Sequence, residues 1–375
     1  MFLKKLNLQN FRNYSNLSLE FDKRPTILLG NNAVGKSNLL ESVYFLSTTK
    51  SQRVETEVEL IKEGEDFSRV GAEVYEIGSV AKQSLEITLQ SAEGQFGKRV
   101  KMNGIPRRVV DFVGNLPAVI FYPSDINMVR GAPALRRWHL DLALVQVDLN
   151  YKKTLTLYEQ ILTNRNRILK KIREGVGKMD ELNYWTEELI SNGRVISEKR
   201  KNFFDFVNKL EKFLGNFKFE YMQSELVMDR LFEYSSREIA AAMTLIGPHR
   251  DDFRITLADT SDVGSDSSDV ESGTMRERDL AHFGSRGEQR TATLAFKLAQ
   301  LEFMANKMGI RPILLLDDVF SELDGQHRAS VIEIVGKQQT IIATVELEHI
   351  PKKFLDGSRI LRVNNGVILS EAKNL

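Results

Sequence analysis

The sequence predicts an α/β fold with a mixed sheet, a strand-rich N-terminal part and an inserted helical domain. Two short apolar segments, residues 26–29 and 312–316, have the composition of buried strands. A glycine-rich loop and a helix follow the first segment, and two acids follow the second. Between them, apolar residues recur at helical spacing over residues 136–243.

A chain of 375 residues is long enough for two or three domains. We expect a first lobe at residues 1–129, a helical insert at 130–244 and a second lobe at 245–375. The 52 basic and 51 acidic side chains nearly balance, so net charge indicates no partner, and the absence of cysteine excludes disulfides and cysteine-ligated metals. No apolar run has the length of a signal peptide or a membrane span, which predicts a soluble, cytoplasmic protein without a membrane partner.

The first lobe should be rich in strands. Apolar positions over residues 2–29 alternate in a strand-like way, which predicts a hairpin that turns near Asn13 and leads into the strand at 26–29. Residues 68–122 also predict mostly strands. Within them, Asn103-Gly104 is a typical two-residue hairpin turn.

Residues 30–37 match the phosphate-binding pattern G-x-x-x-x-G-K-[ST] at every fixed position, between a strand and a helix as the pattern requires. The backbone N–H groups of such a loop, with the start of the helix, can surround a triphosphate. We expect Lys36 to contact the outer phosphates as a catalytic residue and the Ser37 hydroxyl to bind Mg²⁺. The predicted nucleotide-binding residues here are Gly30, Asn31, Asn32, Ala33, Val34, Gly35, Lys36, Ser37 and Asn38.

The second lobe should supply acids to the same site. A polar, acidic stretch at residues 258–275 predicts a disordered loop, and a helix at 289–308 follows it. Asp317 and Asp318 end the next strand, whose end should lie beside the glycine loop in an α/β sheet. We expect Asp317 to help hold Mg²⁺ and Asp318 to polarise the attacking water. A helix at 329–335 and a strand at 340–345 complete this lobe.

Two further elements accompany the loop and the acids. Residues 285–289, Ser-Arg-Gly-Glu-Gln, stand at the start of a helix and offer a second anion site, and Ser-Glu-Leu-Asp follows the acids at 321–324. Together these elements resemble the ABC-type ATPase head of SMC-like DNA-repair proteins. Within that group the whole chain is similar to the RecF family of bacterial recombination mediators. The segments that carry this similarity are LQNFRNY at 8–14, TKSQR at 49–53, NGIPRR at 103–108, FYPSD at 121–125 with Arg136-Arg137, IGPHRDD at 246–252 and LLDDVFSELD at 315–324.

The resemblance implies that two subunits share ATP and Mg²⁺ and hydrolyse the ATP slowly, with stimulation by DNA. It adds Arg12 to the nucleotide-binding residues and Thr344 as a candidate switch residue. The chain departs from most ABC heads in two ways: Asp318 stands where they carry the longer Glu, and Glu288 adds a negative charge at the second anion site. The residues implied to contact the other subunit's nucleotide are Ser285, Gly287, Glu288, Gln289 and Asp324.

The implied function is that of an ATP-induced homodimer that clamps duplex DNA, at single-strand gaps, and helps to load the recombinase. Hydrolysis would release the DNA, and the implied protein partners are RecR and RecO. The insert is too short for the long coiled coils of SMC proteins, which favours the RecF family over its larger relatives. Two alternatives stay open: a nucleotide-gated DNA scaffold with negligible hydrolysis, and a transporter-type ABC ATPase subunit.

Basic residues in three segments are candidates for contacts with DNA phosphates. They have an ordinary alternative, because a charged run on a helix is often only a solvated face. His249 with Asp251 and Asp252 is weak evidence for metal or acid–base chemistry, and we expect a structural or phosphate-sensing element there. The DNA-binding candidates are Lys50, Arg53, Lys101, Arg107, Arg108, Lys152, Lys153, Arg165, Arg167, Lys170 and Lys171.

Overall fold

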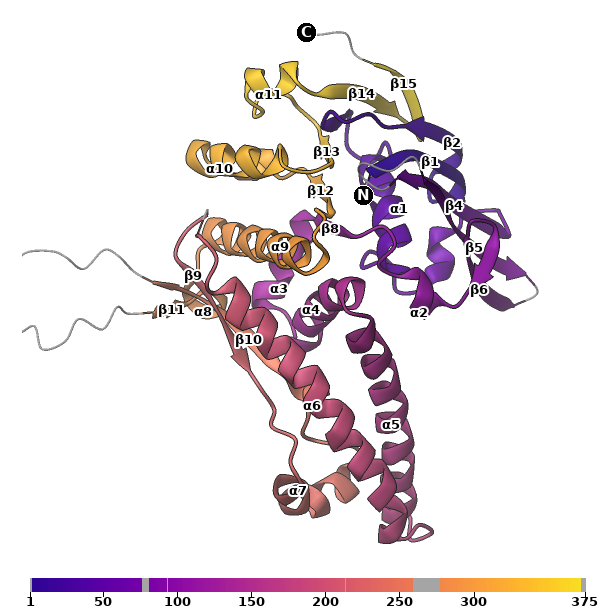
Figure 1. Cartoon of the computed structure of the whole chain (residues 1–375), viewed down its shortest axis with the longest axis vertical. Helices are drawn as coiled ribbons and strands as arrows, with labels where there is room; N and C mark the ends of the chain where they lie inside the picture. Colours follow the sequence, from indigo (N-terminus) through magenta and orange to yellow (C-terminus); the bar gives the residue numbers. More distant parts are fainter. Residues whose placement is uncertain (1, 76–80, 93, 213, 259–276, 372–375) are drawn as a thin grey trace, which may run out of the picture. The chain divides into compact units, whose positions relative to one another are not determined.

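The computed structural model describes residues 2–75, 81–92, 94–212, 214–258 and 277–371 (Figure 1). They form two compact units: unit 1 comprises residues 1–125 and 294–375, and unit 2 comprises residues 126–293. Of the stretch predicted to be disordered, Ala258 ends a strand, and residues 259–275 lie outside the described residues. Within the described ranges, no helix combines the length and apolarity that a bilayer crossing needs.

Unit 1 contains the mixed sheet that the sequence predicts. Its strand order is β15-β14-β3-β13-β12-β8, and every pair is parallel except β14 with β15. The inner strands β12 and β13 are buried at every position, as expected for parallel strands covered on both faces. The strands are β3 (Thr26–Leu29), β8 (Ala118–Phe121), β12 (Ile313–Asp317), β13 (Thr340–Thr344), β14 (Arg359–Asn364) and β15 (Val367–Glu371).

Helix α1 (Lys36–Thr48) packs on β8, β12 and β13 and brings the glycine loop to the end of the sheet. Its residues are buried on nearly all sides, since the second sheet of unit 1 also contacts it. Unit 1 also contains five shorter helical segments among its described residues: η1 (Glu57–Leu60), α2 (Val109–Phe112), η5 (Phe320–Glu322), α10 (Gly325–Val335) and α11 (Lys352–Asp356).

The second sheet of unit 1 is antiparallel, in the order β2-β1-β4-β5-β6-β7. The predicted N-terminal hairpin is confirmed, because Phe11 pairs with Tyr14 across its turn. The predicted turn at Asn103-Gly104 is also confirmed: both residues have positive φ, 52° and 77°, as a hairpin turn of this kind requires. The strands are β1 (Phe2–Phe11), β2 (Tyr14–Glu20), β4 (Phe67–Tyr75), β5 (Lys82–Ala92), β6 (Gln95–Met102) and β7 (Ile105–Arg107).

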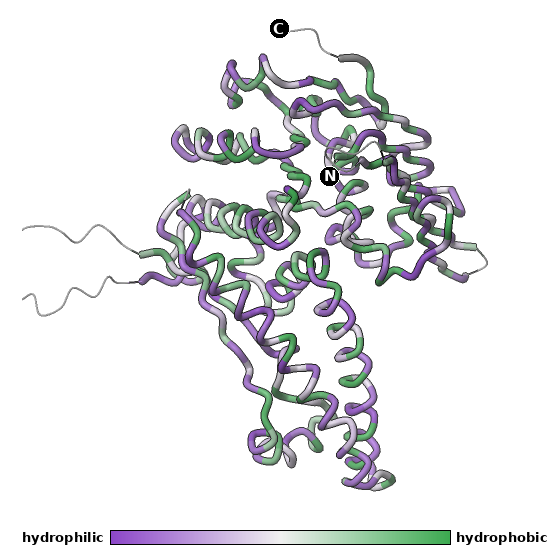
Figure 2. The backbone as a smooth tube through the Cα atoms, viewed as in Figure 1, coloured by the Kyte–Doolittle hydropathy of each residue, from purple (hydrophilic) through white to green (hydrophobic). Residues whose placement is uncertain are grey.

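Unit 2 is mainly helical. Helices α5 and α6 pack along each other (Figure 1), and hydrophilic and hydrophobic residues alternate along both, which fits helices with one buried face (Figure 2). The helical segments are η2 (Pro123–Ile126), which begins in unit 1, α3 (Asn127–Arg130), α4 (Pro133–Val147), α5 (Leu149–Arg173), η3 (Met179–Glu181), α6 (Leu182–Val207), α7 (Met228–Ala241), η4 (Pro248–Arg250) and α8 (Leu280–Phe283).

A three-stranded antiparallel sheet corrects two expectations for this part of the chain. Strand β9 (Phe217–Met222) lies where the sequence predicts continuous helix. It pairs with β10 (Asp252–Ala258), which in turn pairs with β11 (Glu277–Asp279). Because β10 pairs with β9, residues 245–293 group with the helices of unit 2 and not with the second lobe predicted at 245–375. Helix α9 (Arg286–Met308) continues from unit 2 into unit 1.

Candidate nucleotide-binding site

The glycine loop joins β3 to α1, and two of its positions require glycine. Gly35 has a φ of 114°, and a Cβ there would lie 2.6 Å from the side-chain nitrogen of Asn13. A Cβ at Gly30 would lie 2.4 Å from the carbonyl oxygen of Val363 on β14. The loop therefore has room for backbone alone, so its N–H groups can approach a ligand closely.

The N-terminal hairpin holds the loop in place. Tyr14 donates its hydroxyl to the carbonyl of Gly35 at 2.9 Å, and the Asn13 amide donates to the carbonyl of Val34 at 3.1 Å. The Asn38 amide nitrogen donates to the Asn13 side-chain oxygen at 2.8 Å, which ties the first turn of α1 to the same hairpin. The strand-rich N-terminal part therefore supports the loop from outside the parallel sheet.

Lys36 lies at the start of α1 and is 6% exposed. Its Nζ donates to the carbonyls of Gly30 and Asn31 at 2.6 and 2.8 Å, so the ammonium lies inside the curve of the loop. Burial lowers the pKa of Lys36, and the nearby carboxylates of Asp317 and Asp318 oppose that effect. The side chain is placed to meet an anion held by the loop.

The glycine loop and the acids Asp317 and Asp318 line one pocket of about 260 Å³ in unit 1. Asp317 ends β12, and the Ser37 hydroxyl donates a hydrogen bond to its carboxylate. Burial raises the pKa of Asp317, while Ser37, Arg53 and Lys36 lower it. A hydroxyl oxygen beside a carboxylate oxygen is the hard donor set that Mg²⁺ prefers, so these residues fit the predicted metal. The lining residues are Asn32, Ala33, Gly35, Lys36, Ser37, Asn38, Arg53, Pro123, Asp317, Asp318 and Val345.

Asp318 has a left-handed backbone with φ 48°. Its N–H donates to the carbonyl of Ala343 at 2.8 Å, and its own carbonyl accepts from the Ser321 hydroxyl at 2.9 Å. Aspartate tolerates this conformation better than most residues, but a non-glycine residue in it still carries strain. The turn thus fixes the direction in which the Asp318 side chain leaves the end of the sheet, beside Lys36 and Asp317.

Arg53 adds a cation to the pocket that the sequence analysis did not assign to it. This residue, a DNA-binding candidate in the sequence, lines the same pocket as the glycine loop and the two acids. Its guanidinium donates to Asn38 at 3.0 Å and to Glu41 at 3.1 Å, and it lies over the ring of Tyr122. Glu41, a residue that the sequence analysis missed, is a buried acid on α1 and orients this arginine. Glu41 is the single acid in the sequence of α1, which was the available signal.

The side chains of Arg12 and Thr344, predicted as a nucleotide contact and a switch residue, form hydrogen bonds within the chain. Arg12 donates to both carboxylate oxygens of Glu41 at 3.0 Å and to the backbone carbonyls of Glu59 and Arg53, which ties β1 to α1. Thr344 is 4% exposed; its hydroxyl donates to the carbonyl of Glu346, and its own carbonyl accepts from Gly30. The Thr344 hydroxyl is therefore used in a hydrogen bond within its own turn. The next residue, Val345, lines the pocket.

The second predicted anion site lies in unit 2, at the start of α9. Ser285 and Glu288 form a reciprocal capping box: the Ser285 N–H donates to the Glu288 carboxylate at 2.7 Å, and the Glu288 N–H donates to the Ser285 hydroxyl at 3.2 Å. Gln289 is buried, and its amide donates to the carbonyls of Leu280 and Gly284. The predicted nucleotide contact by Gln289 is therefore corrected to a role in holding the turn before α9.

Asp324, the last residue predicted to contact the other subunit's nucleotide, is the N-cap of α10. Its carboxylate accepts from the His327 N–H at 2.9 Å and faces the His327 ring nitrogen at 2.7 Å. These contacts, with the backbone hydrogen bond from His327 as the largest effect, lower the pKa of Asp324. The carboxylate is exposed, so it can also face another molecule.

The family model "RecF/RecN/SMC N terminal domain" matches residues 2–367. The DNA replication and repair protein RecF of Herpetosiphon aurantiacus is 34% identical over 400 aligned residues, which cover 98% of this chain and 99% of that protein. The RecF protein of Bacillus thuringiensis is 32% identical over 396 residues, with 98% of each chain covered. The chain belongs to the RecF family.

Solved RecF structures share this fold. The structure of the recombination mediator protein RecF with ATP has a TM-score of 0.81, is 28% identical and covers 98% of this chain and 98% of its own. A second RecF structure, described as RecF-ATPrS, also has a TM-score of 0.81, at 29% identity. An SMC head from Pyrococcus furiosus has a TM-score of 0.51 at 15% identity, which shows likeness of fold alone. The predicted ABC-type ATPase head is thus confirmed, and membership of the RecF family excludes the transporter alternative.

The structure corrects two of the DNA-binding candidates. Arg165 is 4% exposed and donates to Glu238 at 2.7 Å and to Thr244 at 2.7 Å, so it joins α5 to α7 and cannot reach a DNA phosphate. Lys152 is 8% exposed and is unsuited to such a contact for the same reason. The candidates that stay exposed are Lys50, Arg53, Lys101, Arg107, Arg108, Lys153, Arg167, Lys170 and Lys171.

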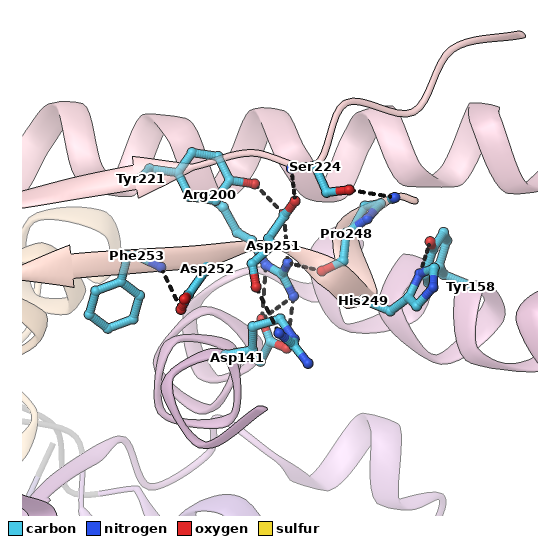
Figure 3. A network of polar contacts seen from close by, with 12 residues as sticks. Asp141, Tyr158, Arg200, Tyr221, Ser224, Pro248, His249, Asp251, Asp252 and Phe253 are labelled. Carbon is cyan, nitrogen blue, oxygen red and sulfur yellow. Dashed lines mark hydrogen bonds and ion pairs between the residues drawn. The ribbon is translucent and has the colours of Figure 1, made fainter. Parts of the chain in front are cut away.

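The segment at residues 246–252, the most distinctive RecF-like stretch of the sequence, is part of a buried polar network (Figure 3). Arg200 on α6 is 2% exposed and donates to Asp141 on α4, to Asp251 and to the carbonyl of Pro248. Asp251 also accepts from the Tyr221 hydroxyl and the Ser224 N–H. The contacts support a structural role for this segment: they join the helices α4 and α6 to the start of β10.

Proposed function

We propose that the chain is an ATP-dependent DNA-binding protein of recombinational repair, which closes on DNA as a homodimer and opens after slow hydrolysis. One pocket in unit 1 carries the proposal. The glycine loop and the acids both line it, and it brings together Lys36, Ser37, Asp317 and Asp318 at the end of one sheet. These are the side chains that phosphoryl transfer from ATP needs. The RecF structures described with ATP and in the RecFOR pathway support the same interpretation.

In the proposed mechanism, the loop's N–H groups and the Lys36 ammonium bind the outer phosphates. Ser37 and Asp317 would hold Mg²⁺, which neutralises charge on the triphosphate. Asp318 orients the attacking water and accepts its proton. Because aspartate is shorter than glutamate, Asp318 is a less favourable base for a water in line with the γ-phosphate, and we expect turnover to be slow.

The proposed homodimer rests on the second anion site at the start of α9, which the family resemblance assigns to the other subunit's nucleotide. Ser285 and Gly287 would bind the γ-phosphate that the other subunit's glycine loop holds, and Asp324 would face the same junction. Each site is then complete only when two chains meet, so ATP strengthens the dimer by bridging it. DNA, with single-strand gaps as the preferred place, would bind the closed dimer through its phosphates, and RecO and RecR are the proposed partners for loading the recombinase.

Solution mass tests the two-subunit mechanism. We expect the chain to be monomeric alone and dimeric with ATP and Mg²⁺, and Asp318→Asn to prolong the dimer by slowing hydrolysis. Ser285→Arg should abolish the ATP-dependent dimer while one chain still binds ATP, because its own glycine loop is unchanged. A mass that does not respond to ATP would contradict the proposal. If Asp318→Asn leaves turnover unchanged, Asp318 is not the catalytic acid, and a DNA scaffold gated by nucleotide becomes the better description.

A further inference from the structure

The turn of the β14–β15 hairpin lies against the glycine loop. Strand β14 runs parallel to β3, the strand that leads into the loop, and β15 runs back antiparallel to β14 (Figure 1). Asn365 and Gly366 form the two-residue turn between them, with φ values of 44° and 75°. The Gly366 N–H donates to the Val34 carbonyl at 2.9 Å. This hairpin, to which the sequence analysis gave no role, therefore reaches the phosphate-binding loop.

Glycine is required at the second position of this turn. Its φ of 75° is left-handed, a conformation that residues with a Cβ rarely adopt. A Cβ at Gly366 would also lie 2.6 Å from the carbonyl oxygen of Asn13, in the turn of the N-terminal hairpin. Gly366 is buried although it lies in a turn. The turns of the two hairpins are thus packed backbone against backbone.

The Val34 carbonyl accepts one hydrogen bond from each hairpin. The Asn13 side-chain amide donates to it at 3.1 Å, and the Gly366 N–H donates at 2.9 Å. A carbonyl oxygen has two lone pairs, so both acceptor positions are used. The peptide bond between Val34 and Gly35 is trans, and its N–H therefore points opposite to its carbonyl. Gly35 lines the pocket, so the two hairpins direct its N–H to where a nucleotide phosphate would lie.

The glycine loop needs such support because its backbone is strained. Ala33 has a φ of 64° although it carries a Cβ, and Gly35 has a φ of 114°. A residue other than glycine keeps a left-handed conformation only where its surroundings hold it there. The hydrogen bonds to the Val34 carbonyl follow directly after Ala33, and the Tyr14 hydroxyl donates to the next carbonyl, that of Gly35, at 2.9 Å. The hairpins fix the loop immediately after its strained residue.

We propose that the Asn365-Gly366 turn is a positioning element for the nucleotide. Its hydrogen bond to Val34 keeps the Gly35 N–H directed at the β-phosphate, which ATP and ADP share. The turn acts through the loop and does not itself touch the nucleotide. The coupling is reciprocal: a turn that favours nucleotide binding is stabilised by the bound nucleotide. The proposal rests on nucleotide binding by the glycine loop, which is part of the proposed function, and is independent of dimer formation.

The nucleotide affinity of one turn variant tests the proposal. Gly366→Ala places a Cβ against the Asn13 carbonyl and should move the turn away from Val34. We expect the Kd for ATPγS and the Kd for ADP, each with Mg²⁺, to rise by about tenfold, because the Gly35 N–H no longer faces the charged phosphate. Isothermal titration calorimetry measures both constants. A loss of affinity for ATPγS alone would place the effect at the γ-phosphate and contradict the proposal.

Gly104→Ala is the matched control. Gly104 is the second residue of another Asn-Gly hairpin turn in unit 1, with a φ of 77°, and a Cβ there would meet no atom within 4 Å. The substitution introduces the same backbone strain at a turn that does not hold the glycine loop. Gly104→Ala should bind both nucleotides as the wild type does. Equal losses of affinity in the two variants, or unchanged affinity in Gly366→Ala, would overturn the proposal.

Hydrogen exchange of the wild type tests the reciprocal effect, and it does so even if Gly366→Ala does not fold. ADP with Mg²⁺ should slow exchange of the Gly366 N–H by about fivefold or more, because the bound phosphate fixes the loop that accepts its hydrogen bond. The Asn103 N–H, which donates to the Ser84 carbonyl at 2.8 Å in the control turn, should exchange at an unchanged rate. If nucleotide binds but leaves exchange at Gly366 unchanged, the positioning role is wrong. If the wild type binds neither ATPγS nor ADP, the proposed function fails as well.

Discussion

His249 has its protonation state fixed by two neighbours. The Thr244 carbonyl can only accept a hydrogen bond, so Nε2 of His249, 3.0 Å away, must carry the proton. The other nitrogen, Nδ1, then accepts from the Tyr158 hydroxyl at 2.8 Å. Burial, together with the charges of Arg250 and Arg137, lowers the pKa of His249 to about 4. The imidazole is therefore a neutral link between α5 and the segment at 246–252.

We predict a pH dependence of stability that His249 causes. Between pH 6.5 and about 4 the unfolded chain binds a proton that the folded chain does not, so the free energy of unfolding falls as the pH falls through this window. The loss amounts to roughly 3 kcal/mol at the lower end. His249→Gln should make that part of the slope disappear. Urea unfolding followed by tryptophan fluorescence measures it in unit 2, where both tryptophans of the chain, Trp138 and Trp185, lie.

The matched control for this prediction is His282→Gln, because the His282 side chain is 75% exposed. This variant should keep the wild-type slope between pH 4 and 6.5. If His249→Gln keeps it as well, another group in unit 2 is responsible and the neutral link at His249 is wrong.

Some site residues could be predicted one by one, and others could not. The spacing of the glycine loop motif predicts the roles of Lys36 and Ser37. The apolar strand that ends at Asp317 predicts the role of that residue. The burial of Arg165 could not be predicted, because it depends on Glu238, which is 73 residues away along the chain. A basic residue on a helix looks the same in sequence whether it faces solvent or a buried acid.

At the scale of elements, a buried ion-pair network joins α4, α6 and the start of β10 (Figure 3). Its centre, Arg200, pairs directly with Asp141 and Asp251, and replacing it would remove that ion pair from both aspartates. We predict that Arg200→Met lowers the free energy of unfolding of unit 2 by about 3–5 kcal/mol, since removing one partner leaves uncompensated buried charge. Urea unfolding with tryptophan fluorescence measures the loss.

An exposed ion pair on the three-stranded sheet of unit 2 is the control for the Arg200 prediction. Arg254 pairs with Glu220 between β10 and β9, where the side chains are 47% and 38% exposed. Arg254→Met should cost much less than Arg200→Met, because solvent already screens the exposed pair. Equal losses in the two variants would mean that the Arg200 network does not hold these elements together.

Elements with a local signal were predictable, and an element held by a distant partner was not. Asn103-Gly104 specifies its own turn through the positive φ of both residues. Strand β9 is only six residues long, between helical segments, and its hydrogen bonds come from β10 about thirty residues further on. The division into units was missed for the same reason, because that pairing attaches β10 to unit 2.

At the scale of the whole molecule, the charges balance but are distributed unevenly. The second half of α5 carries several exposed basic side chains, among them Lys170, Lys171 and Arg173 in its last turn. Cations suit the C-terminal end of a helix, so part of this cluster stabilises α5 itself. Whether it also binds DNA is a question of affinity and of its salt dependence, since phosphate contacts release counterions.

We predict that Lys170→Glu/Lys171→Glu weakens binding of the ATP-bound protein to a gapped duplex by about tenfold or more at low salt. The slope of log Kd against log salt should also decrease by about one for each DNA phosphate that the variant no longer neutralises, measured by fluorescence anisotropy between about 50 and 200 mM salt. Lys352→Glu/Lys353→Glu on α11 makes the same change in net charge and should have little effect on either quantity. If the two double variants bind alike, only net charge matters and the basic part of α5 is a solvated helix face. A weaker affinity with a reduced slope in the α5 variant alone would identify that helix as the place where the closed dimer holds the phosphates.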